Sequence, residues 1–361
     1  MICFPIDSGR MADHGSFHGN VKPVIIEEEL ELTENMPVAA ISEANTGNWT
    51  QQPALSKALV QALKSSHTVS LLDRLRNRKG SYTNTDTDTT MASTAAARTY
   101  LAFQHNAKLT TLKTIVTAIR PFADLEEANR GLFKDGSDQD HVVVTEQTIF
   151  HPQGGGQPSD IGSMTATACS SFAVNSVRMD AVRDGQVLHF GRFIGGAIFK
   201  EGDEVEQAID VEKRLLYSRL HTAGHVLGAA VRHLLEKEVE GFDELKASHF
   251  PDSASCEFQG LIDGKWKEPI QGKVDEFLAA KMPVKVDFWD EDDFRARGLE
   301  RLIPDRSLAP PGEKFRVVEI VGAEVYPCGG THVDTTDLCG ETVVKKISRS
   351  KGKSKVSYAV K

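Results

Sequence analysis

The sequence predicts a mixed α/β protein of the α+β kind, in which a small β-barrel-like subdomain precedes a domain of helices and a largely antiparallel sheet. Three observations predict it. Short segments rich in β-branched residues recur at close spacing between residues 112 and 209, as in small barrels. The segment 210–238 repeats apolar residues at helical spacing. After it, shorter helical and strand-like segments alternate.

The first 97 residues are predicted to form a poorly structured extension that carries no chemistry. Residues 81–94 are a run rich in Ser, Thr, Asp and Asn without periodic apolar positions, which is typical of a linker. Short helices are expected at 53–64 and 69–76. We therefore place a domain boundary after residue 97 and expect the reaction to need nothing before it.

Residues 98–210 are predicted to form the barrel-like subdomain. Their β-branched and aromatic residues indicate strands at 112–119, 141–145, 172–178, 186–190 and 204–209. Segment 121–140 is polar and is expected to be an exposed connection. Segment 150–158, FHPQGGGQP, is predicted to be an irregular loop because glycine and proline interrupt regular structure.

Residues 211–361 are predicted to form the second domain, which begins on the long helix. The apolar residues that mark one face of this helix are Leu216, Leu220, Val226, Leu227, Ala230, Val231 and Leu234. A second helix is expected at 274–281. Strands are expected at 284–289, 315–321, 341–347 and 355–360.

Composition excludes several classes of protein. The 361 residues are 40% hydrophobic and contain no apolar run long enough to cross a bilayer. The first residues do not predict a secretory signal, and early glutamates disfavour a mitochondrial presequence, so a cytoplasmic protein without a membrane partner is expected. The five cysteines are odd in number and widely scattered, which does not indicate a disulfide framework. They are Cys3, Cys169, Cys256, Cys328 and Cys339.

Charge is distributed unevenly along the chain. The net charge of −9 argues against indiscriminate binding of nucleic acid. Residues 342–361 differ from the rest of the chain, because they contain no acidic residue. They contain seven basic residues: Lys345, Lys346, Arg349, Lys351, Lys353, Lys355 and Lys361. This basic segment is either a solvated tail or edge strand, or a contact with a nucleic-acid backbone.

Two pairs of residues indicate a metal site. His221 and His225 are four residues apart on the predicted helix, so both imidazoles lie on one face. Cys328 and His332 are also four apart, and we expect Gly329 and Gly330 to permit a tight turn with positive φ between them. Either pair alone is weak evidence for a metal site, because histidines and cysteines at such spacings often only pack in a core. Together they form the tetrahedral nitrogen and sulfur set that zinc prefers.

The helix differs from a metalloprotease helix. That motif places a glutamate beside the first histidine as a general base. Here Thr222, Ala223 and Gly224 separate the two histidines. Peptide hydrolysis by that route is therefore not expected.

Four motifs together resemble a known family. HTAGHVL at 221–227, CGGTHV at 328–333, FHPQGGGQP at 150–158 and ISRSKGK at 347–353 are similar to motifs of the editing domain of alanyl-tRNA synthetase. They resemble equally its free-standing, AlaX-like relatives. The resemblance extends from about residue 100 to the last residue, and the glycine-rich loop favours the alanyl over the threonyl branch. The synthetase portion that charges tRNA is missing, which implies a trans-editing protein.

The resemblance implies a zinc-dependent hydrolase whose partner is mis-acylated tRNA(Ala). Its expected reaction cleaves the ester between an amino acid and the terminal ribose, on seryl-tRNA(Ala) first and glycyl-tRNA(Ala) second. His221, His225, Cys328 and His332 would act through zinc. The candidate substrate-binding residues are Gly154, Gly155, Gly156, Thr331, Lys351 and Lys353. The hydroxyls of Thr222 and Thr331 could form a hydrogen bond to the hydroxyl of a serine attached to the tRNA, or they could only cap the local backbone.

Three alternatives stay open. The protein could be a zinc-stabilised tRNA-binding module without catalysis, a threonyl-type editing protein, or a zinc hydrolase of a small ester. Four protein ligands fill a tetrahedral zinc site and leave no position for water or substrate. The sequence therefore leaves open whether three or four residues bind the zinc during the reaction. The sequence leaves the preferred amino acid, the oligomeric state and the role of residues 1–97 undetermined.

Overall fold

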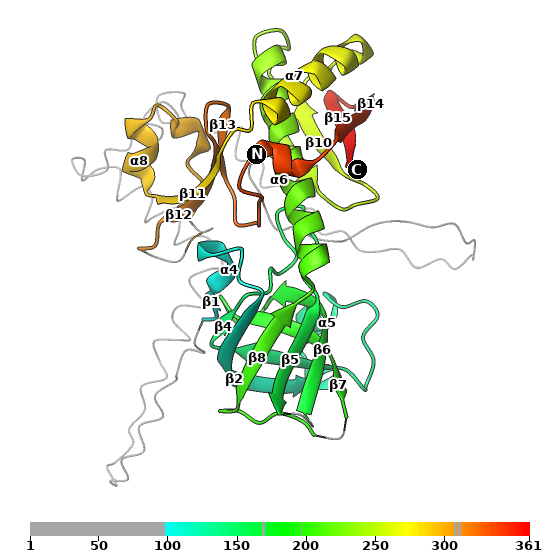
Figure 1. The fold of residues 1–361 in the computed structure, drawn as a ribbon, viewed down its shortest axis with the longest axis vertical. Coiled ribbons are helices and arrows are strands. Elements are labelled where there is room, and N and C mark those ends of the chain that lie inside the picture. Colours follow the sequence, from blue (N-terminus) through cyan, green and yellow to red (C-terminus); the bar gives the residue numbers. More distant parts are fainter. Residues whose placement is uncertain (1–97, 168–169, 196, 307–308, 310–311) are drawn as a thin grey trace, which may run out of the picture. The chain divides into compact units, whose positions relative to one another are not determined.

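The computed structural model describes residues 98–361 except 168–169, 196, 307–308 and 310–311 (Figure 1). All described residues lie in one of the two compact units into which the chain divides. The extension, linker and short helices predicted for residues 1–97 lie outside the described residues, as do Cys3 and Cys169. Within the described part of the chain, no helix has both the length and the apolar character needed to cross a membrane.

Six antiparallel strands close into a barrel in the order β2-β3-β7-β6-β5-β8. The strands are β2 (Thr111–Pro121), β3 (His141–Thr145), β5 (Gly162–Thr167), β6 (Ser170–Met179), β7 (Val187–Ile194) and β8 (Glu204–Ile209). Val143, Met164, Phe172 and Val205 are fully buried in its core. The predicted barrel is confirmed, and closure leaves its sheet without an open edge.

Strand β5 is absent from the sequence prediction, although it closes the barrel. It pairs with both β6 and β8. Its residues, GSMTAT, are mostly small and show no clear alternation. At Gly162 a Cβ atom would overlap the backbone of Ala208 on β8, so the absence of a side chain permits the close approach of the two strands.

The segment 121–140 is largely exposed, as its polarity predicts, but it is not without regular structure. It contains a 3-10 turn, η1 (Phe122–Asp124), and a short helix, α5 (Glu127–Arg130). Leu125 and Phe133 are buried against Leu188 of the barrel. The sequence did not predict these two short elements, because the few apolar residues that anchor them leave no periodic pattern.

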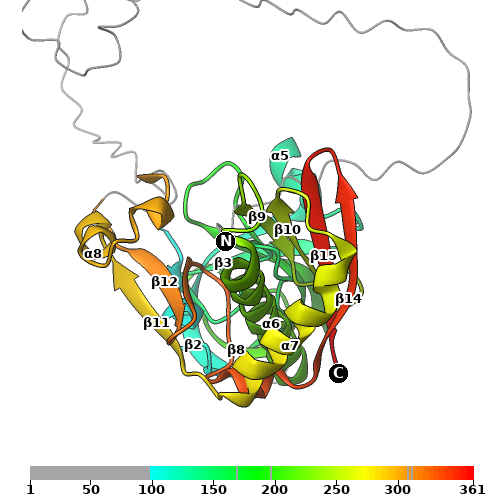
Figure 2. The same cartoon turned by 90° about the horizontal axis from the view of Figure 1, so that it is seen from above.

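The long helix α6 (Val211–Leu235) is confirmed and ends three residues before the predicted position. The Asp210 carboxylate accepts a hydrogen bond from the Lys213 amide at 3.0 Å and caps its first turn. Leu220, Val226 and Leu227 are at most 2% exposed. Viewed from above, α6 runs between a four-stranded and a three-stranded sheet (Figure 2).

Both sheets beside α6 are antiparallel. The first has the order β14-β15-β10-β9, with β9 (Asp243–Ser248), β10 (Ser255–Gln259), β14 (Thr342–Ser350) and β15 (Lys353–Val360). The second has the order β11-β12-β13, with β11 (Val284–Trp289), β12 (Phe315–Ile320) and β13 (Glu324–Pro327). Sequence patterns predicted four of these strands and missed β9, β10 and β13.

Short elements complete the fold. They are β1 (Tyr100–Leu101), α4 (Ala102–His105), β4 (Gln147–Thr148), η2 (Gly264–Trp266), α7 (Lys267–Ala279), α8 (Glu291–Ala296), η3 (Glu300–Leu302) and η5 (Thr336–Cys339). Helix α7 begins seven residues before its predicted start, because Pro269 falls in the first turn, where a helix tolerates proline. β1 and β4 form a parallel pair.

His189 gives the barrel a measurable pH dependence. Its buried ring bonds the Val143 carbonyl at 2.9 Å and the Thr148 hydroxyl at 2.7 Å. Burial lowers the pKa of His189 from 6.5 to about 4, so unfolding takes up a proton between these values. Its contribution to the free energy of unfolding is complete above pH 6.5 and is lost as the pH falls to 4, by up to about 3 kcal/mol.

Urea unfolding between pH 7.5 and 4.5 measures this contribution. Other buried histidines also add to the slope, so the comparison is between the wild type and His189→Gln. We expect the variant to lose less stability on acidification than the wild type does. Parallel curves would contradict the assignment.

Candidate metal centre

Four predicted ligand side chains lie together beside α6. The candidate ligand atoms of His221, His225, Cys328 and His332 are all within 4.8 Å of one another. His221 and His225 project from one face of α6, because four residues span about one helical turn. Cys328 and His332 come from the segment that follows β13. The helix and this segment thus supply two ligands each.

Cys328 lies between two imidazoles. Its Sγ atom is 3.4 Å from Nε2 of His221 and 3.4 Å from Nε2 of His332. The Gly330 amide donates a hydrogen bond to the same sulfur at 3.4 Å. An amide donor stabilises a thiolate, the form of cysteine that binds metals.

The two glycines between Cys328 and His332 do not have the backbone conformation that the sequence predicts. Neither Gly329 nor Gly330 has a positive φ. At Gly330 a Cβ atom would overlap the His221 ring, whereas at Gly329 it would meet only the end of the Gln104 side chain at 3.1 Å. Glycine is therefore needed at position 330 for the close approach of the histidine ring, and the predicted positive-φ turn was wrong.

Hydrogen bonds orient two of the imidazoles. Nδ1 of His221 donates to Oε1 of Gln157 at 2.7 Å. Nδ1 of His332 donates to the Thr222 hydroxyl at 3.1 Å, because that hydroxyl donates its own proton to the Ser218 carbonyl at 2.9 Å. In both rings Nε2 is left unprotonated toward the cluster, which is the arrangement that outer hydrogen bonds impose on metal ligands.

His225 carries the strongest indication of a bound ion. Its side chain is fully buried. Among the described residues, neither of its ring nitrogens has a hydrogen-bond partner. Burial lowers the pKa of His225 to about 4, so the ring stays neutral and able to coordinate. Buried polar atoms are rarely left unsatisfied, and a coordinated metal ion would satisfy one of these two nitrogens.

The donor set therefore fits zinc. Three imidazoles and one thiolate match a structural or catalytic tetrahedral zinc site. Burial lowers the pKa of all three histidines and so keeps them neutral, as coordination requires, and the Gly330 amide would stabilise Cys328 as a thiolate. No carboxylate is part of the cluster, which disfavours calcium and magnesium.

The predicted glycine-rich loop reaches the cluster through its last residues. Gly155 and Gly156 have φ of 56° and 80°, and a Cβ atom at Gly156 would overlap the Ala247 carbonyl. The following residue, Gln157, accepts hydrogen bonds from His221 and from the Thr331 amide at 2.9 Å. Gln157 is part of the FHPQGGGQP motif, but an isolated glutamine carries no spacing signal that would mark it as a site residue.

Thr331 is fully buried within this network. Its hydroxyl accepts a hydrogen bond from Nε2 of Gln157 at 2.9 Å and lies 2.7 Å from the Ser218 hydroxyl. Lys351 and Lys353 lie elsewhere, at the exposed turn between β14 and β15. The structure thus brings Thr331 to the cluster, and it leaves both lysines among the solvent-facing residues of the hairpin.

His249 is a neighbour of the cluster that sequence analysis missed. Its fully buried ring stacks on His221, with centroids 4.2 Å apart and planes 26° apart. Nδ1 of His249 donates to the Tyr358 hydroxyl at 2.7 Å, which in turn donates to the Leu220 carbonyl. At Gly224 on α6 a Cβ atom would overlap the His249 ring. A lone histidine between two undetected strands gives no sequence signal.

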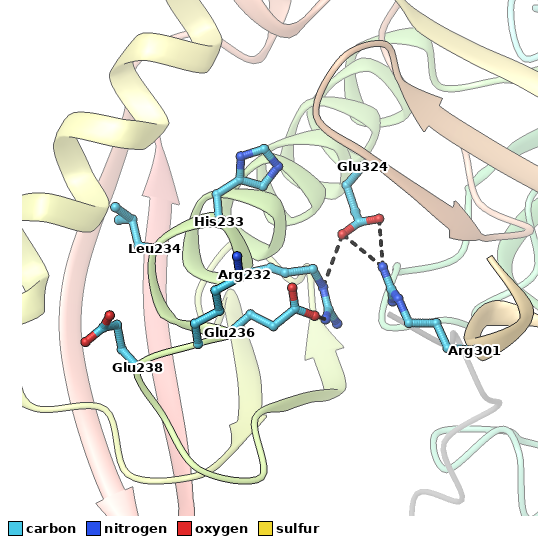
Figure 3. Close-up of a pocket in the computed structure, with 8 residues that line it drawn as sticks. Arg232, His233, Leu234, Glu236, Glu238, Arg301 and Glu324 are labelled. Carbon is cyan, nitrogen blue, oxygen red and sulfur yellow. Dashed lines mark hydrogen bonds and ion pairs between the residues drawn. The ribbon is translucent and has the colours of Figure 1, made fainter. Parts of the chain in front are cut away.

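A separate cavity lies at the C-terminal end of α6 (Figure 3). It measures about 320 Å³ and contains none of the four clustered residues. Glu324 pairs there with Arg232 at 3.1 Å and with Arg301 at 3.2 Å. These mutual ion pairs hold the end of α6 against β13, so we assign the cavity a structural role.

The sheet and the cluster define a class of domain. Residues 315–356 match the family model described as the threonyl and alanyl tRNA synthetase second additional domain. This match includes Cys328, Thr331 and His332. It covers the strands β12, β13 and most of the β14–β15 hairpin.

The chain is 30% identical over 233 residues to the alanyl-tRNA editing protein AlaX-L of Pyrococcus horikoshii, over 64% of this chain and 53% of that protein. It is also 30% identical to the alanine–tRNA ligases of Methanococcus maripaludis and Methanothermobacter thermautotrophicus, over 57% of this chain and 22% of each ligase. The chain thus spans about half the length of AlaX-L and about a fifth of the ligases. The predicted resemblance to alanyl-tRNA editing proteins is confirmed.

Proposed function

We propose that this protein hydrolyses the ester of mis-acylated tRNA(Ala) in trans, and that seryl-tRNA(Ala) is its main substrate and glycyl-tRNA(Ala) its second. The observation that carries the proposal is the cluster of His221, His225, Cys328 and His332, in which the buried His225 ring has no hydrogen-bond partner among the described residues. The similarity to an alanyl-tRNA editing protein supports the substrate class.

Zinc held by these four residues would polarise the ester carbonyl or activate water. The residues of the chain hold the site in place around it. Gln157 fixes the His221 ring and, through Thr331, the segment that carries His332. Within the glycine-rich loop, Gly156 is buried against Ala247 and the Gly154 amide donates to the Gln157 carbonyl at 3.3 Å, so the partly exposed Gly154 and Gly155 are the part of the loop that would approach the acceptor end.

Selectivity would follow the logic of a second sieve. A synthetase pocket discriminates poorly against an amino acid that adds one hydroxyl or lacks one methyl group. A hydrolytic site that hydrogen-bonds the serine hydroxyl leaves its own polar groups unpaired with alanine. Thr331 would contribute through the Gln157 network, because its hydroxyl already contacts Gln157 and Ser218.

The test is release of the amino acid from seryl-, glycyl- and alanyl-tRNA(Ala) by the purified, zinc-loaded chain. We expect fast release of serine, slower release of glycine and little release of alanine. Seryl-tRNA(Thr) is the comparison substrate, since its preferential hydrolysis would assign the threonyl branch instead. Binding of tRNA without any release would favour the non-catalytic module.

We also propose a division of labour along the chain. Residues 98–210 form the barrel and supply the glycine-rich loop, residues 211–361 hold the zinc, and residues 1–97 take no part in the reaction. The proposed location is the cytoplasm, where charged tRNA is used. Fractionation of cells that express the full chain would test the location.

The basic segment is proposed to contact the tRNA backbone. Lys353 and Lys355 alternate with the buried Ser354 and Val356 on β15, so both lysines face solvent on one side of the sheet. Replacement of Lys351, Lys353 and Lys355 by alanine is expected to weaken tRNA binding and to lower the salt dependence of log K by about two to three. Filter binding at several salt concentrations measures both.

A matched control removes the same charge elsewhere. Lys134, Lys200 and Lys237 are exposed residues outside the hairpin. Their replacement by alanine should leave the salt slope close to the wild-type value. Equal losses in the two triple variants would mean that only net charge matters, and the hairpin would then be a solvated edge.

A further inference from the structure

Three aromatic rings form a continuous stack outside the buried core. The rings of Tyr100 and His105 are 5.1 Å apart at 12°, and those of His105 and Phe288 are 4.8 Å apart at 14°. Tyr100 ends the stack and is 52% exposed, although one face of its ring lies against His105. None of the three rings belongs to a core cluster of the described residues.

The stack is joined to the metal centre by a row of residues across three strands. Phe288 on β11 pairs with Arg316 on β12, and the Cys328 amide donates to the Arg316 carbonyl at 3.1 Å. Adjacent strands are about 4.8 Å apart, so the Phe288 and Cys328 backbones are separated by roughly 10 Å. The aromatic stack therefore begins two strands away from a candidate metal ligand.

A second connection runs through α4. Gln104, which precedes His105, donates a side-chain hydrogen bond to the Gly329 carbonyl at 3.4 Å. Arg316 donates to the carbonyls of Gln104 at 2.9 Å and of Cys328 at 2.5 Å. These bonds fix the helix that carries His105 against the segment that carries Cys328. The position of the stack relative to the centre is thus set by the fold.

Exposed aromatic rings beside a hydrolytic centre suit an unpaired nucleotide. Bases of single-stranded RNA stack on aromatic side chains, and this contact accepts any base because every base has a π face. The ester to be cleaved is attached to the last nucleotide of tRNA, so the unpaired bases must lie within a few nucleotide lengths of the metal. A duplex stem, whose bases are already stacked, offers no such surface.

We propose that the Tyr100–His105–Phe288 stack binds the unpaired 3′-terminal nucleotides of tRNA by stacking and so delivers the ester to the metal centre. The proposal rests on the proposed tRNA substrate and names the part of it that this surface recognises. Val286, 43% exposed and two residues before Phe288 on the same strand face, extends the surface with an apolar side chain.

The experiment compares two uncharged tRNA(Ala) molecules, one complete and one lacking the terminal CCA. We expect the wild type to prefer the complete tRNA. Tyr100→Ala should weaken binding of the complete tRNA by about 5- to 150-fold, the range found when a stacking ring is replaced by alanine, and leave binding of the truncated tRNA unaffected. Tyr100→Phe keeps the ring and should bind like the wild type. Phe288→Leu should repeat the effect from the other end of the stack.

Leu261→Ala is the matched control, because Leu261 is 58% exposed and lies outside the stack. Thermal unfolding of each variant checks that the fold is retained. Unchanged affinity of Tyr100→Ala and Phe288→Leu for the complete tRNA, or equal weakening for both tRNAs, would overturn the proposal.

The test also separates this proposal from the proposed function. Stacking that depends on the terminal CCA, in a protein that releases no amino acid, would support the stack while the hydrolase proposal fails. If Tyr100→Ala releases serine and binds the complete tRNA with wild-type affinity, the hydrolase proposal stands and the stacking proposal fails.

Discussion

A chain in which His221 and Cys328 are both replaced by alanine is expected to contain no zinc and to release no serine from seryl-tRNA(Ala). One ligand is lost from α6 and one from the segment after β13, so only two of the four candidate ligands remain. Changes to residues that only orient a ligand cost about 10- to 100-fold in affinity or activity, and the loss of two ligands should exceed that. Elemental analysis and the deacylation assay measure the two effects.

The matched control also removes one histidine and one cysteine. His233 lies on α6, where its ring bonds the Ala323 carbonyl, and Cys339 is buried in the core. A His233→Ala and Cys339→Ala variant should keep one zinc per chain. Full zinc content in the His221 and Cys328 variant would contradict the assigned ligands, whatever its activity.

Gly330→Ala is expected to have the second largest effect. The added methyl group would overlap the His221 ring and press on Gln157, so the imidazole must leave its position at the cluster. We expect zinc affinity to fall by at least about 10-fold, as for other changes that disturb ligand orientation. Competition with a chromophoric chelator would measure the change.

Gly329→Ala is the neighbouring control. Its methyl group would meet only the flexible end of Gln104, at 3.1 Å, which can move by a few tenths of an ångström. Zinc affinity should therefore stay near the wild-type value. A similar loss in both variants would indicate that the turn itself, rather than the approach of the His221 ring, requires glycine.

The parts of the fold that follow strong periodic patterns could be predicted from the sequence. Helix α6 repeats its apolar residues from Leu216 to Leu234, over about five turns, so tertiary packing did not change its identity. The barrel strands with β-branched residues were found for the same reason, whereas β5 was missed because its glycine, serine and threonine residues carry no hydrophobic signal. Barrel closure depends on pairing with distant strands, which local patterns do not encode.

The candidate site divides in a similar way. The four clustered side chains come in two pairs with short spacings, and those spacings are visible in the sequence. Gln157 and His249 reach the cluster from the loop before β5 and from the segment after β9. Such single residues become recognisable only when the three-dimensional arrangement is known. The positive φ expected at Gly329 and Gly330 was wrong because glycine was read as a turn former, when room for a ring was the requirement.

The position of Gln157 has a thermodynamic consequence. This side chain belongs to the loop that precedes β5, yet it bonds a candidate metal ligand on α6. The same region is tied to α6 by a hydrogen bond from Nε of Arg214 to Asp160 at 3.0 Å. Coupling free energies are reciprocal. If the hydrogen bond from His221 to Gln157 raises the affinity for a metal, a bound metal would stabilise the ordered glycine-rich loop by the same free energy. If the proposed zinc binds here, metal loading and order in the glycine-rich loop are coupled, and loss of the metal would weaken both.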